Sequence, residues 1–336
     1  MATAAQVKAL VESHSLGDEA RFRSVVLQIT EAATRTGRTR YAEEVRALLD
    51  AGRTARSAGA GLPARAVPLA QPRGELAGVL TVEQPGTRLA DVALGADVMS
   101  RLHRVLAEQR RQDTLRAHGF DPVRRLLLTG PSGTGKSMTA HALASELLLP
   151  VFTVPLDAVA ELDADEATAK LRLVFDLVAQ TRAVYLFDDL DALLDPARRS
   201  ATDAGSGAGS GARDALRSFT TLLAQDASTS LVVATSNRPQ LLERSVLRRF
   251  DALVDYPLPT TGVVHEVVLR RLREFDLSAV EWPRVASTAS GLSHEEVSAA
   301  ARAAAKQSLL EGRRHVETAA LLGALRERRQ VLKMAP

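Results

Sequence analysis

The segment RRLLLTGPSGTGKSMTAHALASELL, residues 124–148, contains a complete phosphate-binding loop of the form G-x-x-x-x-G-K-[ST]. The motif requires a strand before it and a helix after it, and the flanking residues have those two patterns. Its glycines allow backbone N–H groups to surround a phosphate, and the helix N-terminus adds partial positive charge. The residues expected to contact a nucleotide are Gly130, Pro131, Ser132, Gly133, Thr134, Gly135, Lys136 and Ser137.

A second apolar run ends in two acids that could act on a metal ion and a water beside a bound nucleotide. Residues 183–194 read AVYLFDDLDALL, in which a strand-like stretch ends in Asp188 and Asp189. We expect Lys136 to reach the β- and γ-phosphates, and Ser137 and Asp188 to hold Mg²⁺, the latter through water. Asp189 is then placed to orient or deprotonate an attacking water. The sequence therefore predicts a site for a nucleotide and Mg²⁺.

Two later features could complete this site. Residues 231–237 read LVVATSN, so Asn237 follows another apolar run, where it is either a turn former or an amide that positions the γ-phosphate or the water. Arg248 and Arg249 precede the last apolar run. An arginine doublet is either solvated surface or a means of reaching the γ-phosphate bound by a neighbouring subunit.

The order of apolar segments predicts an α/β fold. Strands are expected at 124–129, 151–156, 183–188, 230–236 and 252–256, with helical patterns between them. Strands that alternate with helices form a parallel sheet covered on both faces. After Pro259 the strand patterns stop, and helices are expected at 262–275, 282–290, 293–311 and 316–331.

These patterns divide the chain into four parts. Residues 1–52 have the spacing of short helices, and residues 53–75 are a linker rich in Gly, Ala, Pro and Arg. The α/β core is expected at 76–259 and a helical lid at 260–336. Within the core, Ser200–Arg213 is rich in Gly, Ser and Ala and predicts a loop.

Composition limits the functional classes. The chain has 336 residues and no cysteine, which excludes disulfides, thiolate metal sites and cysteine nucleophiles. Its start lacks a basic segment followed by a long apolar run, so no signal peptide and a cytoplasmic location are expected. The first 74 residues carry eleven Lys/Arg against seven Asp/Glu, which would suit nucleic acid or an acidic partner, or a solvated surface.

Taken in order, the phosphate-binding loop, the acid pair, Asn237, the arginine doublet and the helical tail resemble the AAA family of ATPases, within the AAA+ superfamily. The resemblance implies a P-loop NTPase sheet of strand order 5-1-4-3-2, ATP and Mg²⁺ as ligands, and a ring, commonly a hexamer. Asn237 would be the first sensor, and Arg248 and Arg249 would act in trans. Residues 6–22 and 167–176 further resemble a bacterial subgroup with a short helical N-terminal module, encoded beside a subtilisin-like serine protease in phage-defence or plasmid-maintenance systems.

Three departures from the family pattern bear on activity. Family members usually have Glu where this chain has Asp189, which retracts the carboxylate by roughly 1.5 Å. In the segment AVAELDADEATAK, residues 158–170, the position of the usual pore-lining aromatic falls near Asp163, and that of the usual glycine falls near Asp165. The second pore-facing loop would fall within residues 194–213, which offer Arg198 and Arg199 but little apolar surface.

Three functions remain open on the sequence alone. The first is an ATPase that oligomerises and remodels or activates a protein partner, such as a serine protease. The second is an ATP-gated scaffold with weak hydrolysis, since the nucleotide site is intact while the force-producing parts are altered. The third is a DNA-dependent ATPase, supported only by the basic N-terminal region, so nucleic acid is not the expected partner. The sequence contains no run of 18 apolar residues, so no membrane-spanning helix is expected.

Overall fold

The computed structural model of the chain describes Thr30, Leu76, 78–194 and 211–334. The chain divides into two compact units, Met1–Val67 and Pro68–Pro336. The predicted N-terminal module, apart from Thr30, and the linker at 53–75 lie outside the described residues. So do 200–210 of the predicted loop, and Arg198 and Arg199.

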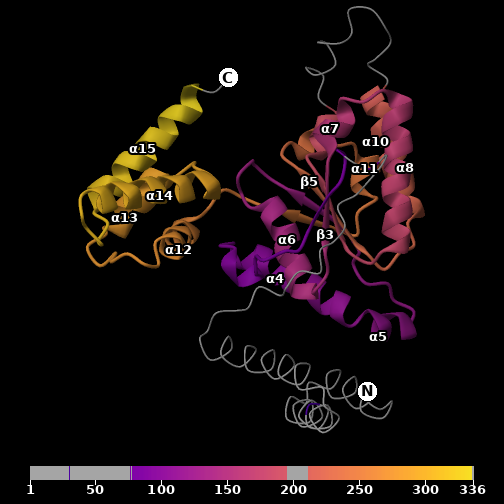
Figure 1. The fold of residues 1–336 in the computed structure, drawn as a ribbon, viewed down its shortest axis with the longest axis horizontal. Helices are drawn as coiled ribbons and strands as arrows, with labels where there is room; N and C mark the ends of the chain where they lie inside the picture. The colour runs from indigo at the N-terminus through magenta and orange to yellow at the C-terminus, as the bar shows by residue number, and fades with distance from the viewer. Residues whose placement is uncertain (1–29, 31–75, 77, 195–210, 335–336) are drawn as a thin grey trace, which may run out of the picture. The chain divides into compact units, whose positions relative to one another are not determined.

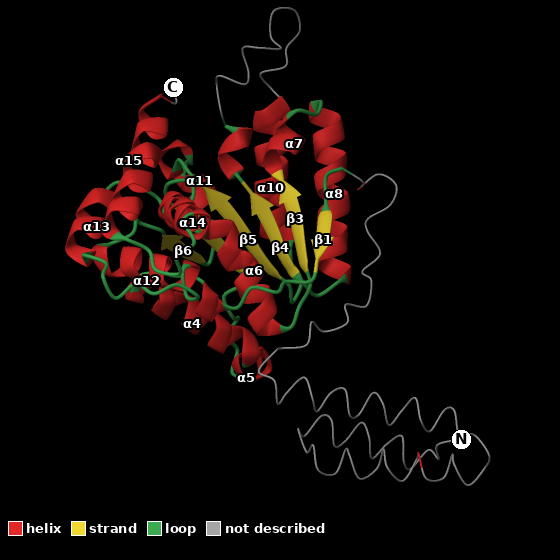
Figure 2. Cartoon of the chain, turned by 60° about the vertical axis from the view of Figure 1, so that its left-hand side comes forward, coloured by secondary structure: helices red, strands yellow, loops and turns green. Residues whose placement is uncertain are grey.

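A six-stranded sheet forms the centre of this unit, with strand order β1-β3-β4-β5-β2-β6 (Figure 2). The strands are β1 (Thr81–Glu83), β2 (Arg125–Thr129), β3 (Val151–Pro155), β4 (Val184–Asp188), β5 (Leu231–Ser236) and β6 (Ala252–Asp255). The five parallel strands have the order expected from the family resemblance, 5-1-4-3-2 when counted from the strand of the phosphate loop. The predicted parallel sheet is confirmed for these five strands, and a sixth strand that the sequence did not indicate, β1, pairs with β3 in antiparallel orientation at the edge.

The register of the parallel strands brings the predicted site residues to one edge of the sheet. Thr129 at the end of β2 pairs with Ser236 at the end of β5, and Phe187 on β4 pairs with Ala234 on β5. The residues that follow these strands therefore leave the same carboxyl edge. This edge is where ligands bind in open α/β sheets.

Helices cover both faces of the sheet (Figure 1). The first face packs against α4 and α6, near α5, and the second against α7, α8 and α10. The bounds of these helices are α4 (Ala96–Arg110), α5 (Gln112–Ala117), α6 (Lys136–Leu147), α7 (Leu156–Ala160), α8 (Ala164–Gln180) and α10 (Gly211–Gln225). Successive residues of each strand alternate between the two faces, so strands buried on both sides are apolar throughout.

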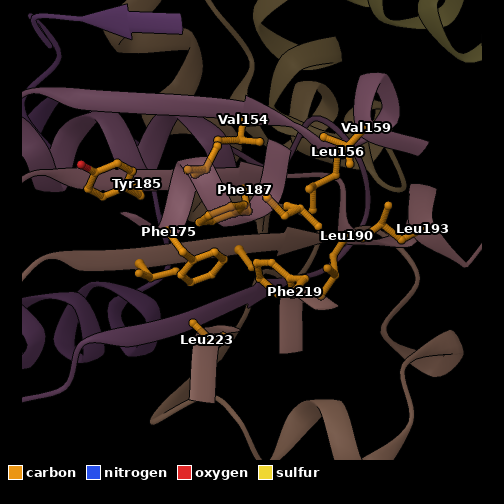
Figure 3. Close-up of a cluster of buried hydrophobic side chains, with 14 of the residues drawn as sticks. Val154, Leu156, Val159, Phe175, Tyr185, Phe187, Leu190, Leu193, Phe219 and Leu223 are labelled. Carbon is orange, nitrogen blue, oxygen red and sulfur yellow. The ribbon is translucent and has the colours of Figure 1, made fainter. Parts of the chain in front are cut away.

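Aromatic side chains fill the second face (Figure 3). The Phe187 ring on β4 stacks on Phe175 of α8 with centroids 5.4 Å apart and meets Phe219 of α10 edge-on at 5.0 Å. Tyr185, on the same face, donates its hydroxyl toward the carbonyl oxygens of Leu177 and Thr181, both at 3.0 Å. Truncating a buried ring such as Phe187 to alanine costs about 3–5 kcal/mol.

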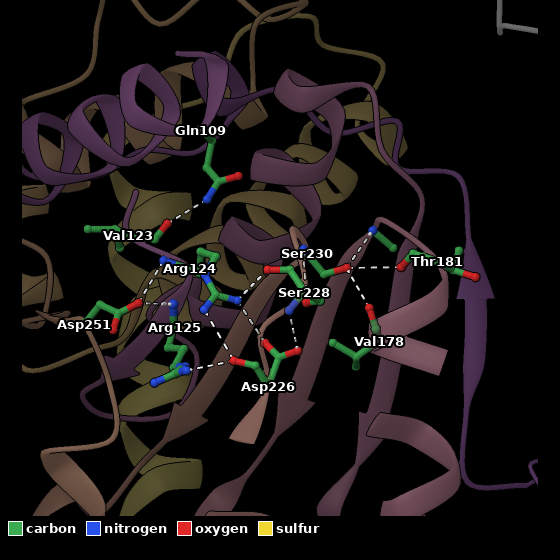
Figure 4. A network of polar contacts seen from close by, with 11 residues as sticks. Gln109, Val123, Arg124, Arg125, Val178, Thr181, Asp226, Ser228, Ser230 and Asp251 are labelled. Carbon is green, nitrogen blue, oxygen red and sulfur yellow. Dashed lines mark hydrogen bonds and ion pairs between the residues drawn. The ribbon is translucent and has the colours of Figure 1, made fainter. Parts of the chain in front are cut away.

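The opposite, amino edge of the sheet is fixed by a polar network (Figure 4). Asp251 accepts the backbone N–H groups of Arg124 and Arg125, both at 2.9 Å. The guanidinium of Arg124 pairs with Asp226 at 3.1 Å, and the Asp226 side chain is 3% exposed. Arg124 thus belongs to this network, and the strand predicted to begin there begins at Arg125.

Four helices follow the core, as the sequence predicts. They are α12 (Thr261–Arg271), α13 (Trp282–Ala289), α14 (His294–Leu310) and α15 (Thr318–Met334). Small residues on α14, Ala300, Ala301 and Ala304, are buried in their shared core. The predicted capping box is present, because Ser293 Oγ accepts from Glu296 N at 3.3 Å and the Glu296 carboxylate accepts from Ser293 N at 2.8 Å. Among the described helices, none has the length and apolar content needed to cross a membrane.

Candidate nucleotide site

The phosphate-binding loop requires its glycines for two different reasons. Gly130, Gly133 and Gly135 have φ of 136°, 74° and 97°, a region that L side chains rarely adopt. Gly130 also lies close to the segment that follows β6, since a Cβ there would be 2.2 Å from the carbonyl oxygen of Tyr256. The loop therefore combines positive φ angles with close backbone approach, directly before α6.

Lys136 connects the loop to the end of β5. Its Nζ donates to the carbonyl oxygens of Gly130 at 2.8 Å and Pro131 at 2.9 Å, and to Asn237 Oδ1 at 2.8 Å. The residue is 5% exposed. Burial lowers the pKa of Lys136, while the nearby carboxylates of Asp188, Asp191 and Asp189 act in the opposite direction. The amino group is thus held at the site by acceptors that a phosphate could replace.

Asp188 lies beside the hydroxyl of Ser137. Its Oδ1 accepts from Ser137 Oγ at 2.7 Å and from Thr235 Oγ1 at 2.6 Å. Its second oxygen makes no hydrogen bond within the described residues. A hydroxyl beside a carboxylate with a free oxygen fits Mg²⁺, which binds proteins through few carboxylates and completes its shell with phosphate and water. Among the described residues, no group of three or more His, Cys, Asp or Glu could hold a metal ion.

Asp189 has an unusual backbone. Its φ and ψ are 60° and 64°, in the left-handed region, where Asp and Asn are tolerated better than most residues. Its N–H donates to Thr235 Oγ1 at 2.9 Å, and its Oδ1 lies 3.5 Å from Asn237 Nδ2. Burial raises the pKa of Asp189, and the carboxylates of Asp191 and Asp188 raise it further. The Asp189 carboxyl is therefore a stronger proton acceptor than an exposed aspartate.

Two residues at this edge were missed by the sequence analysis. Thr235 is 2% exposed, and its hydroxyl joins Asp188 to the backbone of Asp189. Asp191 is 6% exposed and accepts from Ser236 Oγ at 2.7 Å, from Asn237 N, and from Arg238 N at 2.9 Å. The only signal for Asp191 is a third acid in DDLD, which no motif distinguishes from a surface turn.

The arginine doublet lies elsewhere. Arg248 and Arg249 follow the short helix α11 (Arg244–Leu247), and both are exposed. Within the described residues the side chain of neither arginine forms an ion pair, or a hydrogen bond to the phosphate loop or the three aspartates. The chain therefore brings Lys136, Ser137 and the acids together with Asn237, and it leaves the doublet outside this group.

The first helix-turn of α14 contacts the phosphate loop. Glu295 N donates to the carbonyl oxygen of Gly133 at 3.0 Å, and a Cβ at Gly133 would be 2.6 Å from Ser293 Oγ. The neighbouring His294 has its Nδ1 buried without a hydrogen bond in the described structure, and burial lowers its pKa. His294 lines a cavity of about 30 Å³ together with residues of α4 and of the segment after β6, among them Tyr256.

The acidic segment predicted in place of a pore aromatic lies between α7 and α8. Asp163 is the residue before α8, Asp165 lies in its first turn, and both are exposed. Acids in the first turn stabilise a helix through its dipole, so these two residues also have a local structural reason to be there.

Comparison with known proteins finds that part of the chain is similar to one family. The sequence profile of the ATPase family associated with various cellular activities (AAA) matches residues 126–258. An uncharacterized AAA family ATPase of Sinorhizobium fredii is 25% identical over 340 residues, which cover all of this chain and 99% of that protein. The ATP-dependent zinc metalloprotease FtsH 1 of Symbiobacterium thermophilum is 32% identical over 262 residues, or 72% of this chain and 43% of that protein.

Other relatives match a similar share of this chain. A proteasome-activating nucleotidase of Sulfurisphaera tokodaii is 27% identical over 73% of this chain and 63% of its own length. This chain thus spans less than two thirds of the metalloprotease and of the nucleotidase. The crystal structure of the FIGL-1 AAA domain matches with a TM-score of 0.61 and 20% identity over 78% of this chain and 92% of that one, which shows a shared fold. The profile match over residues 126–258 and these relatives support the assignment of that segment to the AAA family of ATPases.

Proposed function

We propose that this protein binds ATP with Mg²⁺, hydrolyses it at the carboxyl edge of the sheet, and uses an oligomer to act on a protein partner. One observation carries the proposal: Lys136, Ser137, Asp188 and Asn237 come from three different strand ends and lie in one hydrogen-bonded group. Thr235 and Asp189 join its two halves. The glycine-rich loop beside this group has the backbone that surrounds a phosphate.

Each residue has a distinct role in the proposed reaction. Lys136 exchanges its carbonyl and amide acceptors for the β- and γ-phosphates, and Ser137 with Asp188 holds Mg²⁺. The bound Mg²⁺ would neutralise charge on the phosphates. Asp189 takes a proton from the attacking water, which its raised pKa favours, and Asn237 orients the water or the γ-phosphate.

The exposure of the arginine doublet supports the proposal that the protein forms an oligomer. Arg248 and Arg249 are exposed and make no ion pair within the described residues, so both guanidinium groups are available to a neighbouring subunit. We propose that they reach the γ-phosphate bound by that subunit in a ring, with six subunits as the family resemblance implies. ATP would then be needed for stable assembly as well as being the substrate.

The partner is proposed from similarity only. FtsH 1 is named as a metalloprotease and the relative from Sulfurisphaera tokodaii as a proteasome-activating nucleotidase, so both names concern the breakdown of proteins. We propose a protein partner for this chain as well, in the cytoplasm. Within that proposal, the subgroup resemblance points to a subtilisin-like serine protease in a phage-defence or plasmid-maintenance system.

An ATP-gated scaffold is the second candidate, and the side chain at position 189 favours it. The Asp189 carboxylate is one methylene shorter than the usual glutamate, and its distance to Asn237 Nδ2 is 3.5 Å, the limit of a hydrogen bond. Misplacement of a catalytic group by about 1 Å can cost about 100-fold in rate. The scaffold would bind ATP and assemble while turning over slowly.

Steady-state ATP turnover against protein concentration tests both candidates. Wild type should turn over at a rate per subunit that rises cooperatively with concentration, because the site is shared. Lys136→Ala should lose ATP binding and ATP-dependent assembly. Lys170→Ala, which removes a lysine paired with Glu166 on the surface of α8, is the matched control and should retain both.

Asp189→Glu distinguishes the two candidates. If wild type is nearly silent and Asp189→Glu raises turnover, the scaffold function holds and the short acid limits hydrolysis. If wild type is active, the hydrolase function holds. Normal ATP-dependent assembly by Lys136→Ala would contradict the proposed site itself.

A further inference from the structure

We infer that Asp191 is a positioning residue, whose buried carboxylate fixes the carboxyl end of β5 and so holds the Asn237 side chain between Lys136 and Asp189. The inference rests on the proposed ATP hydrolysis for its effect on turnover. Its structural part concerns only contacts within the chain. No motif assigns a role to this third acid of DDLD.

The donors around Asp191 come from three consecutive residues. Asp191 Oδ1 accepts from Ser236 Oγ at 2.7 Å, and Oδ2 accepts from the backbone N–H groups of Asn237 and Arg238. Ser236 forms the last pair of the ladder with Thr129, and Asn237 and Arg238 follow it. The carboxylate therefore accepts from the first two backbone N–H groups after the end of β5.

Asn237 needs such support because its side chain makes contacts in two directions. Its Oδ1 accepts from Lys136 Nζ at 2.8 Å, and its Nδ2 lies 3.5 Å from Asp189 Oδ1. An amide that bridges a lysine and a carboxyl must keep both its position and its orientation. Since Asp191 binds the N–H of Asn237 itself and of the next residue, it fixes the backbone on both sides of that side chain.

The contacts of Asp191 differ from those of a metal ligand. Both of its oxygens accept hydrogen bonds, whereas Asp188 retains one oxygen without a bond among the described residues. Asp191 is also 6% exposed. Asp188 and Asp191 are similar in charge and location. Their hydrogen-bond partners differ, and they indicate a ligand role for Asp188 and a positioning role for Asp191.

Two substitutions of Asp191 test the role. Asp191→Ala removes all three bonds and should lower kcat at least about 100-fold, as misplacement of a catalytic group by about 1 Å does, while KM for ATP changes less than about threefold. Asp191→Asn should restore turnover to within about fivefold of wild type. Its amide oxygen can accept both N–H groups, and its NH₂ can donate to Ser236 Oγ. Equal losses in the two variants would show that charge, not positioning, is what matters.

A double-mutant cycle with Asn237→Ala tests the route of the effect. If Asp191 acts through Asn237, then Asp191→Ala should lower kcat less than about threefold further in that background. Independent, multiplying losses would overturn the inference. Should Asp191→Ala not fold, Asp191→Ser, which fills more of the site but cannot reach Asn237 N, takes its place in the cycle.

Asp226→Ala is the matched control for general damage. Asp226 is a buried acid at the opposite end of β5 that accepts from Ser228 N at 3.0 Å and pairs with Arg124 at 3.1 Å (Figure 4). Its loss should lower the melting temperature but leave kcat of the folded protein within about twofold. A comparable loss of kcat in Asp226→Ala would mean that any buried acid that contacts an end of β5 has this effect.

Amide hydrogen exchange provides a readout that needs no turnover. In Asp191→Ala the peptide containing Asn237 and Arg238 should exchange at least about tenfold faster, and in Asp191→Asn it should stay protected. If wild type does not hydrolyse ATP but this exchange pattern is seen, the proposed function fails and the positioning contact stands. Unchanged exchange in Asp191→Ala would refute the inference whatever the turnover.

Discussion

Replacing Gly133 with alanine should weaken the contact between the phosphate loop and α14. Gly133 has φ of 74°, and a Cβ there would be 2.6 Å from Ser293 Oγ and 3.1 Å from the Cβ of Glu295. Gly119 has nearly the same φ, 78°, but a Cβ there would meet nothing within 4 Å. Gly119→Ala is therefore a control that has the backbone strain without the steric conflict.

The expected magnitudes follow from these contacts. A left-handed alanine costs about 1–2 kcal/mol at either position. At Gly133 the added methyl group must also displace Ser293, weakening an N-cap worth about 1 kcal/mol, and disturb the bond from Glu295 N, worth about 1 kcal/mol. We therefore expect a loss of roughly 3–4 kcal/mol for Gly133→Ala, about twice that of Gly119→Ala.

Thermal unfolding measures the difference. Each kcal/mol lowers the melting temperature by about 2–4 °C in a unit of this order of size. The chain has one tryptophan, Trp282 on α13, so its fluorescence follows the helical tail while circular dichroism follows the whole unit. Adding Ser293→Gly to Gly133→Ala should recover about 1–2 kcal/mol, since glycine is tolerated at an N-cap and removes the obstructing atoms. Strictly additive losses, or equal losses at Gly133 and Gly119, would refute the contact.

Three further predictions concern metal, pH and substrate. Asp188→Asn should reduce the enhancement of ATP binding by Mg²⁺ about 10–100-fold, measured by titration with and without the ion; an undiminished enhancement would contradict the metal role. Because burial lowers the pKa of His294, stability should fall as pH drops below about 6.5, where only the unfolded histidine gains a proton. The fall should be shallower in His294→Gln, and identical denaturant midpoints at pH 5 and 7 in both proteins would argue against this. With Asp163 and Asp165 in place of a pore aromatic, the protein should not unfold a tagged, stably folded reporter in the presence of ATP, and loss of reporter fluorescence would disprove that expectation.

Strands with long apolar runs were predictable, and the short edge strand was not. The five parallel strands have four to six residues each, and each has one expected bound and differs by one residue at the other, because buried parallel strands need continuous apolar sequence. β1 is the three-residue segment TVE with a single buried residue, Val82, which gives no period to detect. Its pairing with β3 depends on the edge of the sheet that the other strands create.

The site also contains some residues that the sequence predicts and others that it does not. Lys136, Ser137 and Asp188 are in motifs whose chemistry fixes their spacing, so the sequence indicates them directly. Thr235 and Asp191 are ordinary polar residues whose partners depend on register: because Phe187 pairs with Ala234, the next residue of β5 faces Asp188. Local sequence predicts neither this register nor the contact between Gly133 and α14.

The three acids of DDLD differ in backbone and in partners, and this bears on the short side chain at position 189. Asp188 has a free oxygen beside Ser137, and Asp191 has both oxygens bound. Asp189 stands between them at φ 60°, a conformation that aspartate tolerates better than glutamate. Glutamate at this position would extend the carboxylate by roughly 1.5 Å but would favour a different backbone, which the bond from Asp189 N to Thr235 opposes. The position of the acid is therefore set by the left-handed turn as much as by side-chain length, so Asp189 suits this backbone and is not simply a truncated glutamate.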